Sequence, residues 1–407
     1  MIIDFFAGAL GAGAIEIPEP LIPDAASMHF SIGWIITFAV ILLVNLISPF
    51  HYIRAQFKHH LRAVHIGLVV FHFALAVPFV IYFVNFFAGH SKEPYMATLM
   101  YFAGFYLVYM FYAGTLYLFW DIGRFALRLF SKKRKREPKF RKYSVLITSI
   151  ILAFSVAAAG TSLIFPHHIS ITDYDVTLDK RDSTLSSMKA VFISDSHIGS
   201  AVRAREIDEI VSDTMALNPD IILFGGDIFD EGTSDYLKEY TSKAFSKLSA
   251  KYGVYFILGN HDDYTGDTEA VLSYFEKAGI EVLLNDTILI DDEFYLIGRE
   301  DHPSRRNDLP DLEKSITKDL PVILLDHKPL VRELKKSDLV ELQISGHTHD
   351  GQIYPASWVT PTFISLNYGL HKYGDTQIIV SSGVGGYAVP VRLGSPAEIV
   401  EIGITFQ

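Results

Sequence analysis

The first 165 or so residues carry long apolar runs, whereas the rest of the chain alternates short apolar and polar segments. A helix needs about 20 apolar residues to cross a bilayer. Four runs reach that length in succession, which is rare in soluble proteins, and we therefore expect four membrane-spanning helices. They cover residues 31–50, 66–89, 96–120 and 144–165.

The segment before the first run, residues 1–30, has a different character. Its opening "MIIDFFAGALGAGAI" lacks the basic start of a signal peptide and is too short to span a bilayer. We expect an interfacial or extracytoplasmic segment here, followed by a transmembrane domain over residues 31–165.

Basic residues in the loops predict the orientation. The loop after the first run holds Arg54, Lys58 and Arg62, and the loop after the third run holds "KKRKREPKFRK". Loops rich in Lys and Arg stay in the cytoplasm. With four spans, this predicts a multi-pass protein of the cell membrane whose C-terminal half is extracytoplasmic. The cluster at 132–142 could bind nucleic acid, but anchoring beside anionic lipid is the simpler explanation.

In the C-terminal half, predicted strands alternate with predicted helices, as they do in layered α/β domains. After a polar connector over residues 166–186, apolar runs such as "MKAVFIS" (188–194) and "DIILFGG" (220–226) predict buried strands, and residues 203–217 have helical spacing. This alternation predicts an α/β domain around a central sheet, over residues 187–407.

Charge and composition limit the partners and the metal ligands that the chain can have. Residues 1–143 hold 14 Lys and Arg against 7 Asp and Glu, whereas residues 144–407 hold 21 against 39. The acidic balance argues against nucleic acid as a partner of the C-terminal half. Bound divalent cations would offset part of it. The chain has no cysteine, which excludes disulfides and thiolate metal ligands.

Polar side chains follow five of the predicted strands at the point where each strand ends. The carboxyl ends of strands in α/β sheets gather at one edge, where ligands bind. A single Asp or Asn there is commonly a turn or cap residue, but five clusters with Asp-x-His and His-x-His spacing exceed that need. The candidates are Asp195, His197, Asp227, Asp230, Asn260, His261, His327, His347 and His349.

These side chains offer only oxygen and imidazole nitrogen as ligand atoms. That set suits Mn, Fe, Zn, Co or Ni better than Mg or Ca, because it contains several histidines. Seven ligands drawn from this set would be too many for one ordinary metal site and about right for two metals that share a carboxylate. We therefore expect two divalent metal ions, with Mn, Fe or Zn as the first choices.

The candidates fall in five short blocks, "DSHIG" (195–199), "GGDIFD" (225–230), "GNHDD" (259–263), "DHKP" (326–329) and "GHTHDGQ" (346–352). These blocks resemble the signature motifs of the calcineurin-like metallophosphoesterases and stand in the family order. The match covers about residues 187–407, and the tail that begins "YGLHKYG" resembles the bacterial membrane-associated branch. The resemblance implies a four-layer αββα sandwich and hydrolysis of a phosphomonoester, phosphodiester or pyrophosphate.

The resemblance also implies a role for each residue. One metal would be held by Asp195, His197 and His349. The other would be held by Asn260, His327 and His347, with Asp227 bridging the two. His261 would be the catalytic acid, and Asp230 would orient it. Ser196 and Asp350 depart from the residues common in the family, but neither departure removes a ligand.

The substrate is less constrained by the sequence. We expect His371 and Arg392 to bind substrate, because their segment resembles a loop that closes over the active site, and we expect surface salt bridges for Arg299, Arg305 and Arg306. A lipid-linked phosphate ester suits a membrane protein, and soluble nucleotides remain open. The alternative is a non-catalytic ligand-binding sensor or transport-associated domain, against which the intact ligand set stands.

Overall fold

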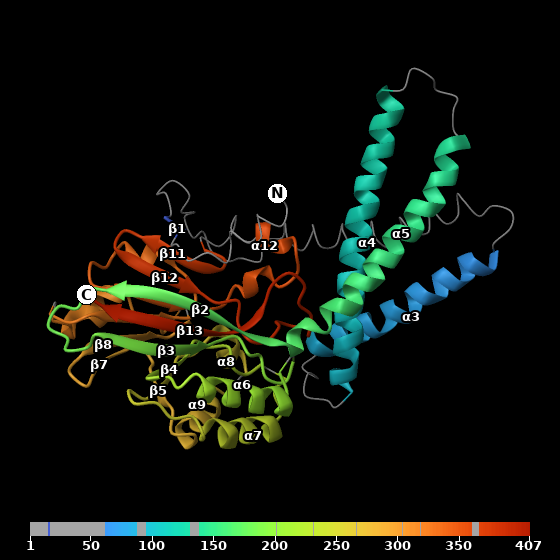
Figure 1. Ribbon diagram of the computed structural model, residues 1–407. Coiled ribbons are helices and arrows are strands. Elements are labelled where there is room, and N and C mark those ends of the chain that lie inside the picture. The colour runs from blue at the N-terminus through green and yellow to red at the C-terminus, as the bar shows by residue number, and fades with distance from the viewer. Residues whose placement is uncertain are drawn as a thin grey trace. The chain divides into compact units, whose positions relative to one another are not determined.

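The computed structural model describes residues 15–16, 62–87, 95–130, 138–200, 202–230, 232–265, 267–302, 304–317, 319–359 and 366–407. The chain divides into a helical unit, Ala25–Ile164, and an α/β unit made of Met1–Asp24 and Phe165–Gln407 (Figure 1).

The helical unit contains three described helices, α3 (Arg62–Phe87), α4 (Met96–Phe130) and α5 (Pro138–Ser162). They overlap three of the predicted spans, and α4 continues well past the predicted end at residue 120. The predicted span at 31–50 and nearly all of residues 1–30 lie outside the described residues.

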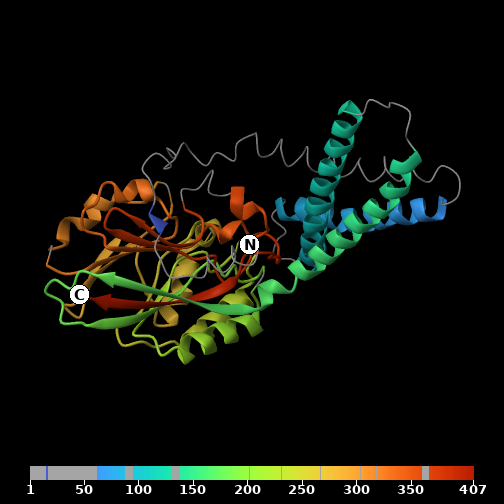
Figure 2. The same ribbon diagram turned by 45° about the horizontal axis from the view of Figure 1, so that its top comes forward.

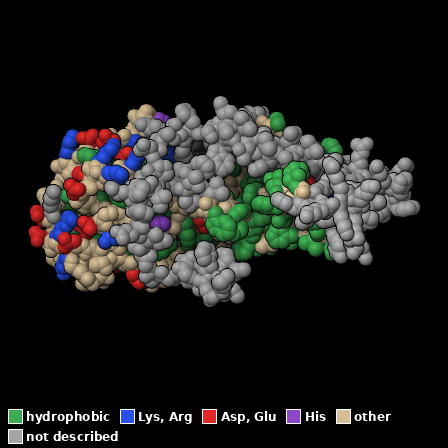
Figure 3. All heavy atoms as spheres, turned by 90° about the horizontal axis from the view of Figure 1, so that it is seen from above, with side chains coloured by type: hydrophobic (Ala, Val, Ile, Leu, Met, Phe, Trp, Pro, Cys, Tyr) green, Lys and Arg blue, Asp and Glu red, His purple; other side chains and the backbone are tan. Residues whose placement is uncertain are grey.

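Two helical stretches among the described residues are long and apolar enough to cross a membrane, Met96–Ala126 and Leu146–His167, and Val70–Asn85 forms a shorter apolar helix. Large apolar side chains are exposed on this unit, including Phe73 and Phe119, and apolar surface gathers over it in Figure 3. Two candidate spans are thus present, and the four-helix domain stays a prediction.

Several polar side chains are buried among the described parts of these helices, and His72 is one of them. His72 of α3 is almost fully buried, and its Nε2 lies 3.1 Å from the hydroxyl of Tyr109 on α4. This hydrogen bond between helices accounts for a histidine in an otherwise apolar run.

The α/β unit contains two mixed sheets. The six-stranded sheet has the order β2-β13-β3-β4-β5-β6, and the seven-stranded sheet has the order β1-β11-β12-β10-β9-β8-β7. The first comprises β2 (Ile169–Leu178), β13 (Ala397–Phe406), β3 (Ser187–Ile193), β4 (Ile221–Phe224), β5 (Val254–Phe256) and β6 (Glu281–Val282). The second comprises β1 (Ile15–Glu16), β11 (Gly369–Tyr373), β12 (Thr376–Val380), β10 (Leu342–Ser345), β9 (Val322–Asp326), β8 (Phe294–Arg299) and β7 (Asp286–Ile290).

The two sheets share one apolar core. Phe192 of β3, Leu296 of β8 and Ile344 of β10 belong to a single buried cluster. Successive strand residues point to opposite faces, so Val191 of β3 joins a different cluster with the helices on the other side of its sheet. There Phe256 of β5 stacks on Phe275 of the helix α9 (Thr268–Lys277), with ring centroids 3.8 Å apart.

Helices flank both sheets (Figures 1 and 2). Apolar residues of α6, α7 and α9 belong to the cluster beside the six-stranded sheet, and residues of α10 and α11 belong to a cluster beside the seven-stranded sheet. The mixed α/β fold is therefore confirmed. The helices are α6 (Ala204–Ala216), α7 (Asp235–Phe245), α8 (Asn260–Tyr264), α9 (Thr268–Lys277), α10 (Leu309–Leu312), α11 (Val331–Leu334) and α12 (Ala356–Val359), with short 3₁₀ turns η3 (Phe165–His167), η4 (Glu313–Ser315) and η5 (His349–Gly351).

Local sequence signals explain where the longer helices begin and end. The Ser234 hydroxyl accepts a hydrogen bond from the amide of Leu237 at the start of α7, and the Asp267 carboxylate accepts one from Ala270 at the start of α9. Such caps satisfy amides that have no partner within the helix. Gly279 follows α9 with a φ of 79°, the left-handed conformation that ends many helices.

The predicted connector, residues 166–186, is not an irregular linker. Ten of its residues, Ile169–Leu178, form β2, which pairs in parallel with β13 along its whole length. The α/β unit therefore begins before residue 187, close to the end of the candidate span that reaches His167.

Candidate metal centre

The predicted ligands lie where strands of the two sheets end. Asp195 and His197 follow β3, Asp227 follows β4, Asn260 follows β5, His327 follows β9, and His347 and His349 follow β10. β3, β4 and β5 are mutually parallel, and so are β9 and β10. Their carboxyl ends meet at one edge of the domain, as expected for a ligand site in an α/β fold.

The backbone at these residues is held in an unusual conformation. Five of the seven have left-handed φ angles: 52° at Asp195, 44° at His197, 54° at Asp227, 72° at His347 and 50° at His349. A non-glycine residue there costs on the order of 1–3 kcal/mol and persists only where its surroundings enforce it, commonly at functional sites. The surrounding structure therefore holds these residues in a strained conformation, at a cost in folding stability.

Two glycines allow the loops to approach the carboxylates. A Cβ atom on Gly259 would lie 2.1 Å from Oδ1 of Asp227, and one on Gly346 would lie 2.1 Å from Oδ2 of Asp195. Both distances are far inside van der Waals contact, so no larger residue fits. This explains why glycine precedes Asn260 and His347.

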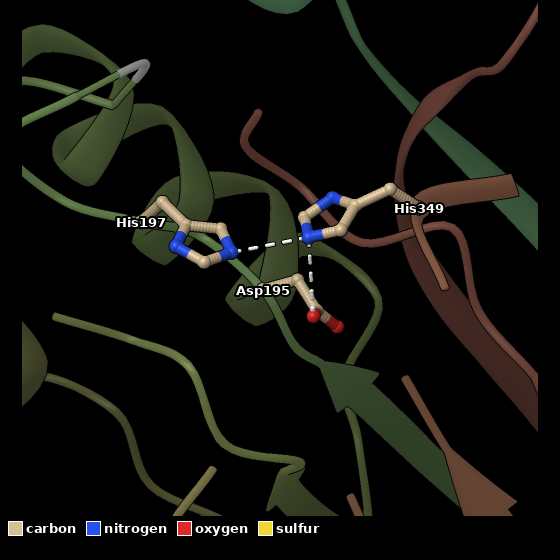
Figure 4. Close-up of side chains that lie close together, drawn as sticks. All are labelled: Asp195, His197 and His349. Carbon is tan, nitrogen blue, oxygen red and sulfur yellow. Dashed lines mark hydrogen bonds and ion pairs between the residues drawn. The ribbon is translucent and has the colours of Figure 1, made fainter. Parts of the chain in front are cut away.

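Three of the predicted ligands form the first group, shown in Figure 4. Nε2 of His197 lies 3.1 Å from Nε2 of His349, which in turn lies 3.5 Å from Oδ1 of Asp195. All three side chains are buried, and their ligand atoms lie within 4.8 Å of one another.

The second group contains Asp227, His327 and His347, whose ligand atoms also lie within 4.8 Å of one another. Oδ2 of Asp227 is 3.0 Å from Nε2 of His327, and Nδ1 of His347 is 3.3 Å from the same nitrogen. The orientation of the His327 imidazole is fixed by its other ring nitrogen, because Nδ1 donates to the carbonyl of Gly225 at 2.8 Å.

The two groups adjoin. The backbone amide of His347, a member of the second group, donates to both carboxylate oxygens of Asp195, a member of the first, at 3.0 Å. The backbone amide of His197 donates to the carbonyl of Asp227 at 3.1 Å. Asn260 begins α8 beside the second group, and its Oδ1 is buried without a hydrogen-bond partner among the described residues.

Asp230 and His261 border the first group. Oδ1 of Asp230 lies 2.6 Å from Nδ1 of His197 but 3.8 Å from Nδ1 of His261, which is too long for a hydrogen bond. Asp230 also accepts from the hydroxyl of Ser200. The backbone amide of His261 donates to Oδ1 of Asp227 at 2.6 Å. Asp230 therefore fixes His197 directly and faces His261 at longer range.

The charges of the cluster are strongly coupled. Burial acts to lower the pKa of His197, but Asp230 and other carboxylates outweigh it and raise this pKa to about 9. Burial likewise opposes charge on His327, but Asp227 raises its pKa to about 10. Burial acts to raise the pKa of Asp227, yet the imidazoles around it, His327 above all, hold it well below its usual value. The carboxylates thus favour positive charge in the cluster, from protons or from cations.

Residues 188–351 match the family model described as calcineurin-like phosphoesterase. The matched segment contains both groups together with Asn260, His261 and Asp230. This segment is a calcineurin-like metallophosphoesterase domain. Its class is that of metal-dependent phosphoesterases, which are hydrolases acting on phosphate esters.

Several curated proteins are similar to this chain. A "Transmembrane protein with metallophosphoesterase domain" of Danio rerio is 28% identical over 337 residues, which cover 77% of this chain and 74% of that protein. An "Uncharacterized metallophosphoesterase" of Helicobacter pylori is 34% identical over 236 residues, covering 56% of this chain and 62% of that protein. A metallophosphoesterase of Campylobacter jejuni is 28% identical over 390 residues, covering 90% and 97%.

Among solved structures, a dimetal phosphatase from Danio rerio superposes with a TM-score of 0.32 at 14% sequence identity. The superposition covers 55% of this chain and all of that chain.

The spacing of the ligand atoms fits metal coordination. Two imidazole nitrogens bound to one ion at about 2.1 Å each lie about 3.0–3.4 Å apart when the bonds are 90–110° apart. The nitrogens of His197 and His349 are 3.1 Å apart, and those of His327 and His347 are 3.3 Å apart. The unpartnered oxygen of Asn260 supplies a further donor atom beside the second pair.

The two residues predicted to bind substrate, Arg392 and His371, lie in different environments. The guanidinium of Arg392 is fully buried and donates to the carbonyls of Gly385, Ser382 and Gly383, and to Ser395 and Pro396. These five bonds occupy all five of its N–H groups.

The same guanidinium lies 3.3 Å from Nδ1 of His349. The geometry of Arg392 thus favours positioning a ligand over touching a phosphate. His371 lies on β11, where its Nε2 faces the carbonyl of Tyr368 at 2.9 Å, and it belongs to neither group.

Arg299, Arg305 and Arg306 form ion pairs as expected, but not all on the surface. Arg299 is 1% exposed and donates to Asp326 at 3.0 Å, and Arg306 donates to the other oxygen of Asp326 at 2.9 Å. These buried charges hold the residue that immediately precedes His327. Arg305 is more exposed and pairs with Asp263 at 2.6 Å.

The sequence patterns missed two residues at the centre. The Asp262 carboxylate accepts four backbone amides, from Asp227, Ile228 and Phe229 on one loop and from Gly259 on the next. Its position in "GNHDD" was the signal that could have drawn attention to it. The second, Tyr387, lies in a glycine-rich run, and its ring centroid is 4.9 Å from that of His261.

Proposed function

We propose that the chain is a membrane-anchored phosphoesterase that uses two divalent metal ions to hydrolyse a phosphomonoester, phosphodiester or pyrophosphate. The observation that carries this proposal is the convergence of the two ligand groups at one edge of the domain. We further propose that the sheets and their flanking helices make the four-layer αββα sandwich of this family.

In this proposal one ion is held by Asp195, His197 and His349, and the other by Asn260, His327 and His347. Asp227 would be the residue that the two ions share: its Oδ2 lies 3.0 Å from Nε2 of His327, and its backbone carbonyl accepts from the backbone amide of His197, so it stands between the two groups. Mn, Fe or Zn suits the mixed oxygen and nitrogen ligands. When bound, a pair of such ions stabilises both the attacking and the leaving oxygen in a displacement at phosphorus.

His261 is the proposed proton donor. Its backbone amide is fixed to Asp227 at 2.6 Å, and its Nδ1 faces Asp230. We assign to Nε2, the other ring nitrogen, the proton that passes to the leaving oxygen. Imidazole suits this task because its unperturbed pKa lies near neutral pH. Asp230 positions His197 by a 2.6 Å contact, and the same carboxylate oxygen lies 3.8 Å from Nδ1 of His261.

Substrate binding is proposed for His371 on sequence grounds, and Arg392 is assigned to positioning His349 because its N–H groups are occupied. The helices anchor the domain at a membrane, consistent with the candidate spans Met96–Ala126 and Leu146–His167. The extracytoplasmic placement of the domain is proposed from the basic segment 132–142, of which residues 138–142 begin α5 and residues 132–137 lie outside the described residues. A lipid-linked phosphate ester suits this placement.

The test is hydrolysis of bis(p-nitrophenyl) phosphate by detergent-solubilised full-length protein, first stripped of metal and then supplied with Mn²⁺, Fe²⁺ or Zn²⁺. We expect turnover only with metal, followed by selectivity in a screen of lipid phosphates and nucleotides. Metal binding without turnover on any ester would favour a ligand-binding sensor instead.

A further inference from the structure

Two exposed aromatic side chains lie beside the metal centre. Tyr387 is 43% exposed, and its ring packs against that of His261 with centroids 4.9 Å apart. Trp358, on α12, is 65% exposed. Gln352, which follows η5, binds the backbone of Tyr387: its side-chain oxygen accepts from the amide of Tyr387 at 2.8 Å, and its side-chain amide donates to the carbonyl of the same residue at 3.2 Å.

The segment that carries Trp358 is attached to the loop of a predicted ligand. The side-chain amide of Asn367 donates both to the carboxylate of Asp350 and, at 3.4 Å, to the carbonyl of Ser357. Asp350 directly follows His349. The segments of Trp358 and Tyr387 are therefore both tied by hydrogen bonds to the residues that follow His349, and we call this pair the aromatic rim.

The polypeptide enters the α/β unit at the same end. β2 begins at Ile169, which lies opposite Ala397, the first residue of β13. β13 runs antiparallel to β3, so the start of β2 lies at the end where β3 delivers Asp195. Figure 1 shows β2 starting at the end of the domain that carries α8 and α12. His167 Nδ1, 3.1 Å from the Glu206 carboxylate, fixes the chain there.

The connection to the membrane helices is very short. The candidate span Leu146–His167 ends two residues before Ile169. Two residues of extended chain cover at most about 7 Å. With that candidate span in a bilayer, the covalent connection keeps the start of β2 within about 7 Å of the end of the span.

We propose that the aromatic rim, Tyr387 and Trp358, contacts the lipid headgroup layer of the bilayer in which the helices of this chain are embedded. Tyr and Trp concentrate at such interfaces because each combines an apolar ring with a polar group. Esters in that layer then reach the metal centre without leaving the membrane. The inference rests on the membrane anchoring in the proposed function and is independent of the hydrolytic activity.

The chain offers a direct test because it has three tryptophans, Trp34, Trp120 and Trp358. The double variant Trp34→Phe/Trp120→Phe leaves Trp358 as the only tryptophan. Its emission is measured for the full chain in phosphatidylcholine nanodiscs, with and without brominated acyl chains. We expect strong quenching in the brominated discs and an emission maximum shifted to the blue. Equal emission in both discs, with free access of aqueous acrylamide, would overturn the proposal.

A control probe is available at the opposite end of the domain. Leu289 of β7 is 43% exposed and pairs with Tyr295 near the start of β8. Leu289→Trp, in a background with all three native tryptophans replaced by Phe, should show no quenching by brominated lipid. Quenching as strong as that of Trp358 would also contradict a contact specific to the rim.

Turnover of bis(p-nitrophenyl) phosphate in the same discs separates this inference from the proposed function. Metal-dependent turnover without quenching of Trp358 refutes the aromatic rim alone. Quenching without turnover under any metal refutes the proposed activity and leaves the rim standing.

Discussion

Oδ2 of Asp227 lies 3.0 Å from Nε2 of His327, although Asp227 follows a strand of one sheet and His327 follows a strand of the other. Each of the two ligand groups draws on both sheets in this way. The centre therefore forms only when the inter-sheet core is packed, and binding of metal is expected to stabilise that packing in return.

Removal of metal should abolish hydrolysis reversibly. We expect a chelator to eliminate turnover of bis(p-nitrophenyl) phosphate and Mn²⁺, Fe²⁺ or Zn²⁺ to restore it. Metal binding only to the folded state adds about 2.7 kcal/mol when free metal is 100 times its Kd, so the melting temperature should fall on chelation. Unchanged turnover and melting in chelator would be incompatible with this account.

Replacement of His261 by Ala should separate metal binding from catalysis. The side chain is not among the proposed ligands, so metal content should stay at the wild-type level. Loss of a general acid typically reduces turnover by about 10²–10⁴-fold, and the loss should be largest for esters with poor leaving groups. A rate within about threefold of wild type across all leaving groups would remove His261 from the mechanism, since it falls far short of that range.

Arg392→Lys should weaken the metal site without touching a ligand. Lysine keeps the charge but cannot make the five bonds that hold the guanidinium beside His349. We expect about 10–100-fold weaker metal binding, the range seen when residues that support ligands are changed. Competition with a fluorescent chelator measures this change.

Arg305→Lys is the matched control for that experiment, because the Arg305 side chain is 45% exposed and contacts no proposed ligand. Its metal affinity should match that of the wild type. If both variants bind metal equally well, Arg392 has no positioning role.

Asp326→Asn should destabilise the metal-free protein by about 3 kcal/mol near neutral pH, because it leaves Arg299 and Arg306 buried without their shared carboxylate. Burial opposes charge on Asp326, but Arg306 and Arg299 outweigh it and lower its pKa. The stabilisation is therefore complete above the unfolded pKa near 3.9 and disappears as the pH falls through the lower folded value. Melting curves of both proteins in chelator should converge in acid. A difference in melting temperature between the two proteins that grows as the pH falls would contradict this prediction.

The strand ends of the α/β unit were predictable from sequence because each buried strand is a short apolar run, and the clusters of Asp, Asn and His mark its end. β2 was missed because "ISITDYDVTL" is an edge strand with one exposed polar face, and its partner β13 lies more than 200 residues away in the chain. The signal for that pairing is not local.

The supporting residues of the centre were harder to predict than its ligands. Asp262 looks like any helix-start carboxylate in the sequence, and its role depends on a loop that follows another strand. Arg392 looked like a phosphate-binding residue, but Gly383 and Gly385 bring backbone carbonyls close enough to occupy it. Residue type alone indicates which side chains can bind metal, whereas the residues that position those side chains are determined by packing.

The number of metal ions bound per chain tests the central claim most directly. Full-length protein loaded with Mn²⁺ and freed of excess metal should contain two ions per chain by inductively coupled plasma mass spectrometry. Asp227→Asn, which loses the shared carboxylate, should retain fewer than one. A wild-type chain that binds none, or an Asp227→Asn chain that retains two, would contradict the account.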